Sequence, residues 1–333
     1  CYSYFMKIFI SGADGFLGSH LTEKLLNLGH KVTALSYYNS FGFTGWLDEI
    51  KKNKDLKIIH GDVRDYNFLD DALKGHQIVF HLAALISIPH SYKSYSSFLD
   101  TNVIGTSNIL TASKKNNIKR VIVTSTSEVY GTAQYVPINE KHPLNAQSPY
   151  AASKIAADQL SLSFFKSFNL PVVIIRPFNA FGPRQSTRAI IPTVITQSLQ
   201  GKNIKLGNTS TVRDFTYFKD TIDGFIKCMS KKGIDGETIN VASGYEISIK
   251  KVISTILDLT ESNGKIIKEK KRFRPIKSEV NRLWGCNKKA KKLLSWKPNY
   301  SGINGFKKAI SETIEWYRES ENLKKFDPNQ FNI

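Results

Sequence analysis

The sequence predicts an α/β protein with a doubly wound parallel sheet and a smaller α/β lobe in its C-terminal half. Short apolar runs alternate with helical patterns from Lys7 to about residue 178. A turn with three glycines joins the first run to the first helix, and beyond residue 178 the pattern becomes less regular. Alternating strands and helices are typical of a parallel sheet covered by helices on both faces.

The strands expected in this sheet are short runs rich in apolar and β-branched residues. They are Lys7–Ser11, Lys31–Leu35, Leu56–His60, Gln77–Leu82, Arg120–Thr124 and Pro171–Arg176. Apolar residues at helical spacing predict the helices between them. These are a helix that follows the glycine turn and ends at Gly29, and helices over Tyr66–Leu73, Phe98–Asn116 and Ser148–Phe168.

We therefore expect residues 6–178 to form the main domain. Residues 179–333 should form mainly a second lobe, with some later segments returning to the main domain. This second part contains a predicted strand at Thr238–Val241 and predicted helices at Ser248–Leu259 and Ile303–Glu319. Open α/β sheets bind ligands at the carboxyl edge of their strands, so a lobe over that edge would bind substrate.

Composition and charge argue against several classes of protein. The 333 residues carry a formal net charge of +19, but the lysines and arginines are spread along the chain. The densest clusters, Lys268–Arg272 and Lys288–Lys292, lack the interleaved aromatic residues that stack on bases. No apolar run approaches the length of a bilayer span. We therefore expect no nucleic-acid or membrane partner, and a positive field that attracts an anionic substrate.

The cysteines and histidines give no sign of a disulfide framework or a metal site. Cys1, Cys228 and Cys286 have no CxxC spacing, and an odd number without a signal-peptide pattern favours a reducing compartment. We therefore expect a cytoplasmic protein. No His/Cys cluster has metal-ligand spacing, so no metal is expected.

The glycine turn predicts a dinucleotide site. Gly12, Gly15 and Gly18 follow the pattern G-x-x-G-x-x-G directly between a strand and a helix. A side chain in such a turn would block the backbone from a pyrophosphate, and the helix N-terminus supplies N–H donors and a positive dipole. The alternative is a tight turn that is only structural. The strand–turn–helix setting favours the nucleotide and thus a Rossmann-type main domain.

The strand ends give a less complete cofactor signature. Ser36 follows the second strand where an acid that binds the adenosine ribose is common, and no arginine stands there for a 2′-phosphate. NAD is therefore expected, with NADP left open. Asp62, after the third strand, could meet the adenine amino group or cap a helix. Further expected cofactor contacts are Phe16, Leu17, Val63, Leu82, Ala83, Ala84 and Asn102.

Tyr150 and Lys154 are candidate catalytic residues. Their i, i+4 spacing puts a phenol and an ammonium on one helical face, where the cation can stabilise the phenolate. Such a phenolate can take a proton from a sugar hydroxyl. The fifth strand runs into Thr126, Ser127 and Glu128, which brings hydroxyls and a carboxylate to the same edge of the sheet. A solvent-facing pair would be the structural alternative.

These motifs resemble the extended short-chain dehydrogenase/reductases that modify nucleotide sugars. The resemblance runs from Lys7 to about Tyr317. More narrowly, the stretches 124–131, 176–179, 182–185 and 213–216 resemble the N-acetylglucosamine-nucleotide 4,6-dehydratases of legionaminic acid biosynthesis. This resemblance implies substrate contacts by Asn179, Arg184, Arg213 and Arg274, and a homodimer or larger oligomer.

Glu128 is the residue that favours dehydration. A dehydratase must remove the C5 proton once C4 has become a ketone, and a carboxylate is the natural base. The dTDP-glucose dehydratases carry an Asp-Glu pair here, whereas Ser127-Glu128 is similar to the GDP-mannose dehydratases. We therefore expect Glu128 to act as base and, once protonated, as acid for the C6 hydroxyl.

Three alternatives remain open. A UDP-glucuronate decarboxylase also carries a Thr-Ser-Glu-Val-Tyr-Gly run, but usually has an arginine in the segment before its tyrosine, where this chain has residues 146–149. A nucleotide-sugar 4-epimerase comes next. A non-catalytic dinucleotide-binding module would have no need of a tuned phenol beside a carboxylate. The resemblance favours GDP over UDP as the nucleotide.

Overall fold

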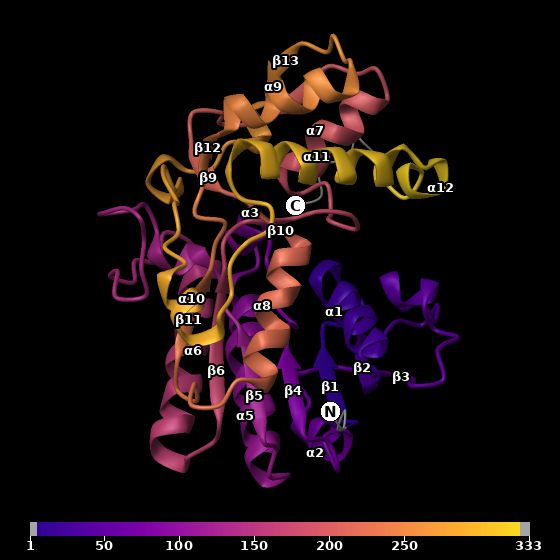
Figure 1. The fold of residues 1–333 in the computed structure, drawn as a ribbon, viewed down its shortest axis with the longest axis vertical. Coiled ribbons are helices and arrows are strands. Elements are labelled where there is room, and N and C mark those ends of the chain that lie inside the picture. Colours follow the sequence, from indigo (N-terminus) through magenta and orange to yellow (C-terminus); the bar gives the residue numbers. More distant parts are fainter. Residues whose placement is uncertain (1–4, 327–333) are drawn as a thin grey trace.

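The computed structural model describes residues 5–326 and divides them between a large sheet and a smaller lobe, the lower and upper parts of Figure 1. The sheet has seven strands in the order β11-β6-β5-β4-β1-β2-β3, and all its pairings are parallel. These strands are β1 (Lys7–Ser11), β2 (Lys31–Tyr37), β3 (Leu56–Gly61), β4 (Ile78–His81), β5 (Arg120–Thr124), β6 (Val172–Pro177) and β11 (Thr238–Val241). The predicted doubly wound α/β fold is confirmed.

Helices cover both faces of the sheet because its central strands β1, β4, β5 and β6 are buried and largely apolar on both sides. On one face Ile8 and Ile10 pack with Leu21 of α1 and Phe225 of α8. On the other face Phe9 packs in a separate apolar cluster with residues of the remaining helices. The helices of the first face are α1 (Phe16–Asn27), α8 (Phe218–Ser230) and α10 (Lys288–Leu294), and those of the second are α2 (Tyr66–Ala72), α5 (Gly105–Lys115) and α6 (Pro149–Phe168).

The strand β11 is a later segment that belongs to the main sheet. Thr238–Val241 falls in the part of the sequence expected to be mainly lobe with some segments returning, and it pairs with β6 from Thr238↔Ile174 to Val241↔Pro177 at an edge of the main sheet. Its Ile239 and Val241 are fully buried in the same apolar cluster as α1 and α8. A four-residue apolar run is compatible with a strand in the lobe or in the main sheet, and only its long-range pairing with β6 decides between them.

The smaller lobe has its own apolar core, formed by three helices. These are α7 (Ile190–Leu199), α9 (Ile249–Thr260) and α11 (Gly302–Arg318), followed by the short α12 (Ser320–Leu323). The predicted helices at Ser248–Leu259 and Ile303–Glu319 correspond to α9 and α11. Two-stranded ladders complete the lobe: β7 (Ala180–Phe181) with β10 (Thr216–Tyr217), β8 (Ile204–Leu206) with β13 (Ile266–Lys268), and β9 (Val212–Asp214) with β12 (Glu246–Ser248).

Short helical segments fill the connections on the sheet's carboxyl side. The predicted helix over Phe98–Asn116 is divided into a short helix, a π-helical segment and α5. The segments are α3 (Ile88–Ser91), α4 (Tyr95–Phe98), the π-helix Leu99–Ile104, and 3₁₀ turns at Gly45–Glu49, Ser127–Tyr130, Lys270–Arg272 and Ile276–Ser278. Within residues 5–326 no helix is long and apolar enough to cross a bilayer. Cys228 and Cys286 are free thiols, and Cys1 lies outside the described residues.

Aromatic and ionic contacts join the lobe to the sheet domain. Trp46, from the connection after β2, packs edge-on against Trp316 of α11 at a centroid distance of 5.5 Å. Arg184 reaches from the lobe side to Glu23 of α1 and Glu49, with N–O distances of 2.8 Å to each. These contacts fix the lobe over the carboxyl edge of β1.

A buried ion pair supports the centre of this edge. Arg176 of β6 donates to Asp158 of α6 through Nε at 3.0 Å and Nη2 at 2.8 Å. The same carboxylate accepts a hydrogen bond from Ser125 at the end of β5, at 2.8 Å. Both charged side chains are nearly inaccessible to solvent. The pair therefore fixes α6 against the strand ends from which the site is built.

We predict that Asp158→Ala lowers the free energy of unfolding by about 3–5 kcal/mol, because it leaves the Arg176 guanidinium buried without its partner. Urea titration followed by circular dichroism measures the change. Asp71→Ala is the matched control, since Asp71 forms an exposed pair with Lys74 and its loss should leave the urea midpoint unchanged. Equal midpoints for the two variants would contradict a supporting function of the buried pair.

Candidate active site

The glycine turn is closely packed at two of its three glycines and open at the third. Gly12 has φ +68°, and a Cβ there would lie 2.7 Å from the Ala83 nitrogen; at Gly18 a Cβ would collide with the Gly12 carbonyl. At Gly15 it would meet only the Gly12 carbonyl, at 3.5 Å. Helix α1 has Gly15 at its N-cap and no side-chain cap. Its first N–H groups are therefore available to an anion, as binding of a dinucleotide pyrophosphate requires.

The turn forms one end of a cavity of about 760 Å³ that extends to the small lobe. Its walls come from the carboxyl ends of β1, β4, β5 and β6 and from the first part of the lobe. Cavities of this size suit ligands with several connected groups. Predicted residues that line it are Gly12, Gly15, Phe16, Leu17, Gly18, Leu82, Ala83, Ala84, Thr126, Ser127, Glu128, Tyr150, Asn179, Arg184, Arg213 and Arg274.

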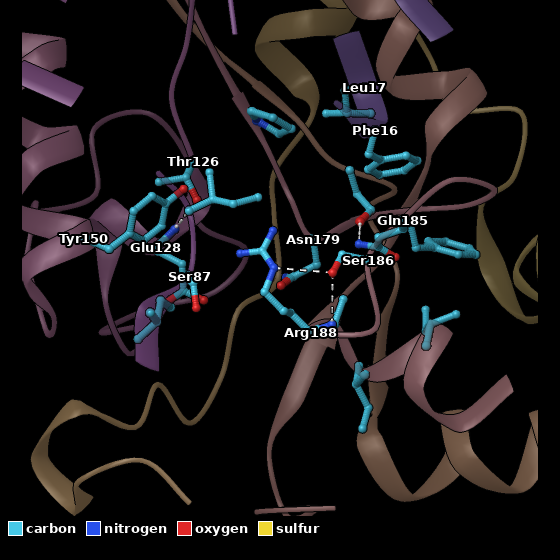
Figure 2. Close-up of a pocket in the computed structure, with 18 of the residues that line it drawn as sticks. Phe16, Leu17, Ser87, Thr126, Glu128, Tyr150, Asn179, Gln185, Ser186 and Arg188 are labelled. Atoms are coloured by element: carbon cyan, nitrogen blue, oxygen red, sulfur yellow. Dashed lines mark hydrogen bonds between the residues drawn. The ribbon is translucent and has the colours of Figure 1, made fainter. Parts of the chain in front are cut away.

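Thr126, Glu128 and Tyr150 lie together on one wall (Figure 2). The first two leave β5 through a 3₁₀ turn in which the Thr126 hydroxyl accepts the Glu128 N–H at 3.2 Å. Tyr150 lies in the first turn of α6, packed edge-on against Phe98. Burial raises the pKa of the Tyr150 phenol well above its usual range, and a hydrogen bond from Thr126 opposes this rise. The phenol therefore keeps its proton until a ligand or cation stabilises the anion.

Lys154 lies beneath this group. Its ammonium donates to the Thr124 carbonyl at 2.6 Å, and no hydrogen bond joins it to the Tyr150 hydroxyl within the described chain. Burial lowers the pKa of Lys154 to about 8. The ammonium is thus held at the end of β5 and not directly on the phenol, contrary to the simplest form of the predicted pair.

Two predicted arginines, Arg213 and Arg274, line the cavity beside Glu279. Arg213 is buried, and Glu128 is among the charges that act on it. Arg213 and Arg274 approach one carboxylate oxygen of Glu279, at 3.7 and 3.9 Å. These distances are too long for strong hydrogen bonds. Arg213 Nη1 donates to the Val212 carbonyl at 3.0 Å, but the guanidinium has further N–H groups that can donate to phosphate oxygens, as Arg274 does. Asn179 donates to the Asp214 carbonyl at 3.1 Å, which fixes it beside them.

Two predicted contacts need correction. Arg184 lines the cavity, but its guanidinium is occupied by Glu23 and Glu49, so it joins the lobe to α1 and is not free for substrate. Asn102 is fully buried, and its amide exchanges hydrogen bonds with the Leu85 backbone at 2.8 and 2.9 Å. It therefore supports the loop after β4 and cannot reach a cofactor in the cavity.

The remaining predicted cofactor residues lie near the strand ends, outside the cavity wall. Ser36 is buried and donates to Asp14 at 3.1 Å. Asp62 accepts hydrogen bonds from the Arg64 side chain, so its carboxylate is already paired. Val63 is buried against Gly105. No group of three His, Cys, Asp or Glu side chains suited to a metal occurs in residues 5–326.

Arg188 was not predicted from the sequence and lies in the middle of the cavity. Figure 2 shows its guanidinium directed toward the wall that carries Tyr150 and Glu128. Its Nε donates to Ser186 at 3.4 Å, a long hydrogen bond, and its charge lowers the pKa of Tyr150 against the effect of burial. The only signal in the sequence is its position in the loop that continues Gly182–Gln185, and nothing there shows that this loop returns to the catalytic tyrosine.

Comparison with known proteins agrees with this geometry. The family model of GDP-mannose 4,6-dehydratase matches residues 9–309. A UDP-N-acetyl-alpha-D-glucosaminuronate decarboxylase of Bacillus cytotoxicus is 35% identical over 95% of this chain and 99% of its own length.

Two solved structures share the whole fold. The dTDP-glucose 4,6-dehydratase DesIV of Streptomyces venezuelae, with NAD bound, has a TM-score of 0.89 at 28% identity and covers 98% of this chain and 100% of its own. The UDP-glucuronic acid 4-epimerase of Bacillus cereus, bound to UDP-glucuronic acid and NAD, has a TM-score of 0.86 at 27% identity, covering 96% and 99%. The fold and the glycine turn of this chain, together with these matches, show that it belongs to the GDP-mannose 4,6-dehydratase family, NAD-dependent enzymes that act on sugar nucleotides.

Proposed function

We propose that the chain is a sugar-nucleotide 4,6-dehydratase that converts N-acetylglucosamine linked to GDP or UDP into its 4-keto-6-deoxy form. The observation that carries the proposal is the placement of Glu128 in the cavity, on the wall with Thr126 and Tyr150. A phenol can serve oxidation at C4, and a separate carboxylate can serve the proton at C5. An epimerase needs only the first of these groups.

The first step is oxidation of C4. Tyr150 takes the proton of the C4 hydroxyl, and Thr126 holds that hydroxyl by a hydrogen bond. Bound NAD would accept the hydride from C4 and return it later to C6. Arg188 stabilises the phenolate by its positive charge, which offsets the cost of burying an anion. Lys154, held on the Thr124 carbonyl at the end of β5, would add a second positive charge beneath the phenol.

Elimination of water follows. The C4 ketone acidifies C5, and Glu128 removes the C5 proton. The C6 hydroxyl then leaves as water with the proton that Glu128 has gained, and a double bond forms between C5 and C6. Glu128, reprotonated from solvent, then gives a proton to C5 while the hydride held by bound NAD returns to C6. The products are one water and the 4-keto-6-deoxy sugar, with no net change in the cofactor's oxidation state.

The arginines set the orientation of the substrate. Arg213 and Arg274 line the same cavity, beside Glu279, where the diphosphate and nucleotide would bind. Planar guanidinium groups suit phosphate oxygens. The resemblance in the sequence favours GDP over UDP.

A homodimer belongs to the same proposal. Tyr95, Leu99 and Ile104 form an exposed apolar strip on the α4–α5 segment, which supports an interface there. Two neighbouring aromatic side chains do not belong to this strip: Phe98 is buried against Tyr150, and the Tyr92 hydroxyl meets Ser278 at 2.6 Å. Those two side chains therefore build the site and are not available to a partner.

Decarboxylation of a uronic acid nucleotide is the second candidate. It is favoured by Arg188, whose cation near Tyr150 could pair with a C6 carboxylate, and by the likeness to the Bacillus cytotoxicus enzyme. The segment before Tyr150 contains no arginine, but Arg188 reaches the same wall from another loop. Because decarboxylases carry the same Thr-Ser-Glu-Val-Tyr-Gly run, the presence of Glu128 does not separate the two candidates. In a decarboxylase the C5–C6 bond breaks without removal of a C5 proton, so the product and the effect of replacing Glu128 separate them.

We predict that Glu128→Gln still oxidises C4 but forms about 10²–10⁴-fold less product, because it lacks the C5 base. Reduced cofactor should therefore accumulate, seen as near-ultraviolet absorbance after GDP- or UDP-N-acetylglucosamine is added. Tyr150→Phe is the matched control and should give neither absorbance nor product. Mass spectrometry of wild-type product should show loss of one water. Full turnover by Glu128→Gln, or loss of carbon dioxide from a uronic acid nucleotide only, would overturn the proposal.

Arg188 gives a prediction on pH dependence. Its cation lowers the pKa of Tyr150, so Arg188→Met should raise that pKa and move the rising limb of the pH–rate profile to higher pH. Arg188→Lys keeps the charge, so its rising limb should return most of the way to the wild-type position. The measurement is kcat against pH for the three proteins at saturating substrate. If the Arg188→Met profile coincides with the wild-type profile, the cation does not act on the phenol.

A further inference from the structure

The corner at the end of β2 contains a carboxylate that does not come from β2. Asp14, within the glycine turn, accepts hydrogen bonds through Oδ2 from the Ser36 hydroxyl at 3.1 Å and the Tyr37 N–H at 3.2 Å. In dinucleotide-binding folds an acid about 20 residues after the glycine turn commonly binds the adenosine ribose at this place. Here the strand offers a serine and a tyrosine, and the turn itself supplies the acid.

The backbone of Asp14 is fixed by the segment after β2. The backbone N–H of Trp46 donates to the Asp14 backbone carbonyl at 3.2 Å. Gly45, with φ +57°, passes so close that a Cβ there would lie 2.5 Å from the same carbonyl. Asp14 lines the cavity beside Gly12 and Gly15. Its second oxygen, Oδ1, makes no hydrogen bond with any residue from 5 to 326, so the carboxylate can still accept from a ligand hydroxyl.

Arg64, a cation that reaches this corner, is already paired with a carboxylate. Arg64, whose Nη2 lies 3.3 Å from the Tyr37 hydroxyl, is also bonded to Asp62 at 2.5 Å through Nη2 and 2.9 Å through Nε. Its charge is thus already matched by one carboxylate, and Asp14 is a second. A ribose diol can donate hydrogen bonds to Asp14, whereas a 2′-phosphate would place two anions side by side.

We propose that Asp14 binds the adenosine ribose hydroxyls of NAD and excludes the 2′-phosphate of NADP, in place of the usual acid at the end of the second strand. The inference concerns the cofactor only. It holds or fails independently of whether the sugar is dehydrated or decarboxylated.

The test is competition between the two cofactors, read without any sugar. The protein is equilibrated with equal concentrations of NAD⁺ and NADP⁺, freed of unbound nucleotide, and the released cofactors are separated and quantified. Asp14→Asn keeps the size of the side chain and can still accept from Ser36 and Tyr37. It should lower the bound NAD:NADP ratio by about 10-fold or more, because a hydrogen bond to a charged group contributes about 1.5–3 kcal/mol.

Asp48→Asn is the matched control. Asp48 lies in the adjoining 3₁₀ turn and bonds to Thr44 and Lys51, outside the cavity. The bound NAD:NADP ratio of Asp48→Asn should equal that of the wild-type protein. Titration calorimetry of each cofactor shows which affinity changes, and thermal unfolding reports on the fold. An unchanged ratio in Asp14→Asn would refute the proposal, and so would equal weakening of both cofactors, which would mean that Asp14 only braces the turn.

Discussion

Parallel pairing of β4, β5 and β6 beside β1 forces all of their carboxyl ends onto one edge of the sheet, and every part of the site depends on this constraint. The glycine turn follows β1, the Leu82–Ala84 loop follows β4, and Thr126 follows β5. Residues far apart in the sequence thus meet without any long loop. The buried pair of Asp158 and Arg176 keeps α6, and with it Tyr150, at a fixed height above that edge.

Burial and charge act against each other within the cavity. Burial raises the pKa of Tyr150 and lowers that of Lys154, so without ligands the site favours a neutral phenol. Arg188 and Arg213 add positive charge to the cavity, and Arg213 meets its carboxylate partner Glu279 only at 3.7 Å. An anionic sugar nucleotide is therefore attracted to the cavity, and the phenolate needed at C4 is stabilised where that substrate binds. Around Asp14 the charge is negative instead of positive, which favours the hydroxyl groups of a diol over a phosphate.

Local patterns in the sequence were sufficient to predict most of the fold. Strands such as Lys7–Ser11 and Arg120–Thr124 are apolar on both faces, and the glycine turn permits few conformations, so both could be recognised without tertiary information. The location of Thr238–Val241 could not, because a short apolar strand does not specify its neighbour. Arg184 resembles a phosphate ligand in sequence, but the fold places Glu23 and Glu49 against it. Arg188 lies in a loop that returns to the wall with Tyr150, and Asp14 contacts the end of a different strand, β2. No local pattern in the sequence encodes either contact.

The proposed function depends on Glu128 moving a proton at C5, and the product formed in D2O reports on that step directly. GDP- and UDP-N-acetylglucosamine are incubated with the enzyme in D2O, and the sugar is examined by proton and carbon NMR. Dehydration by the route described here yields a 4-keto-6-deoxy sugar that carries deuterium at C5. A product inverted at C4 that keeps its C6 hydroxyl and its C5 proton would contradict it.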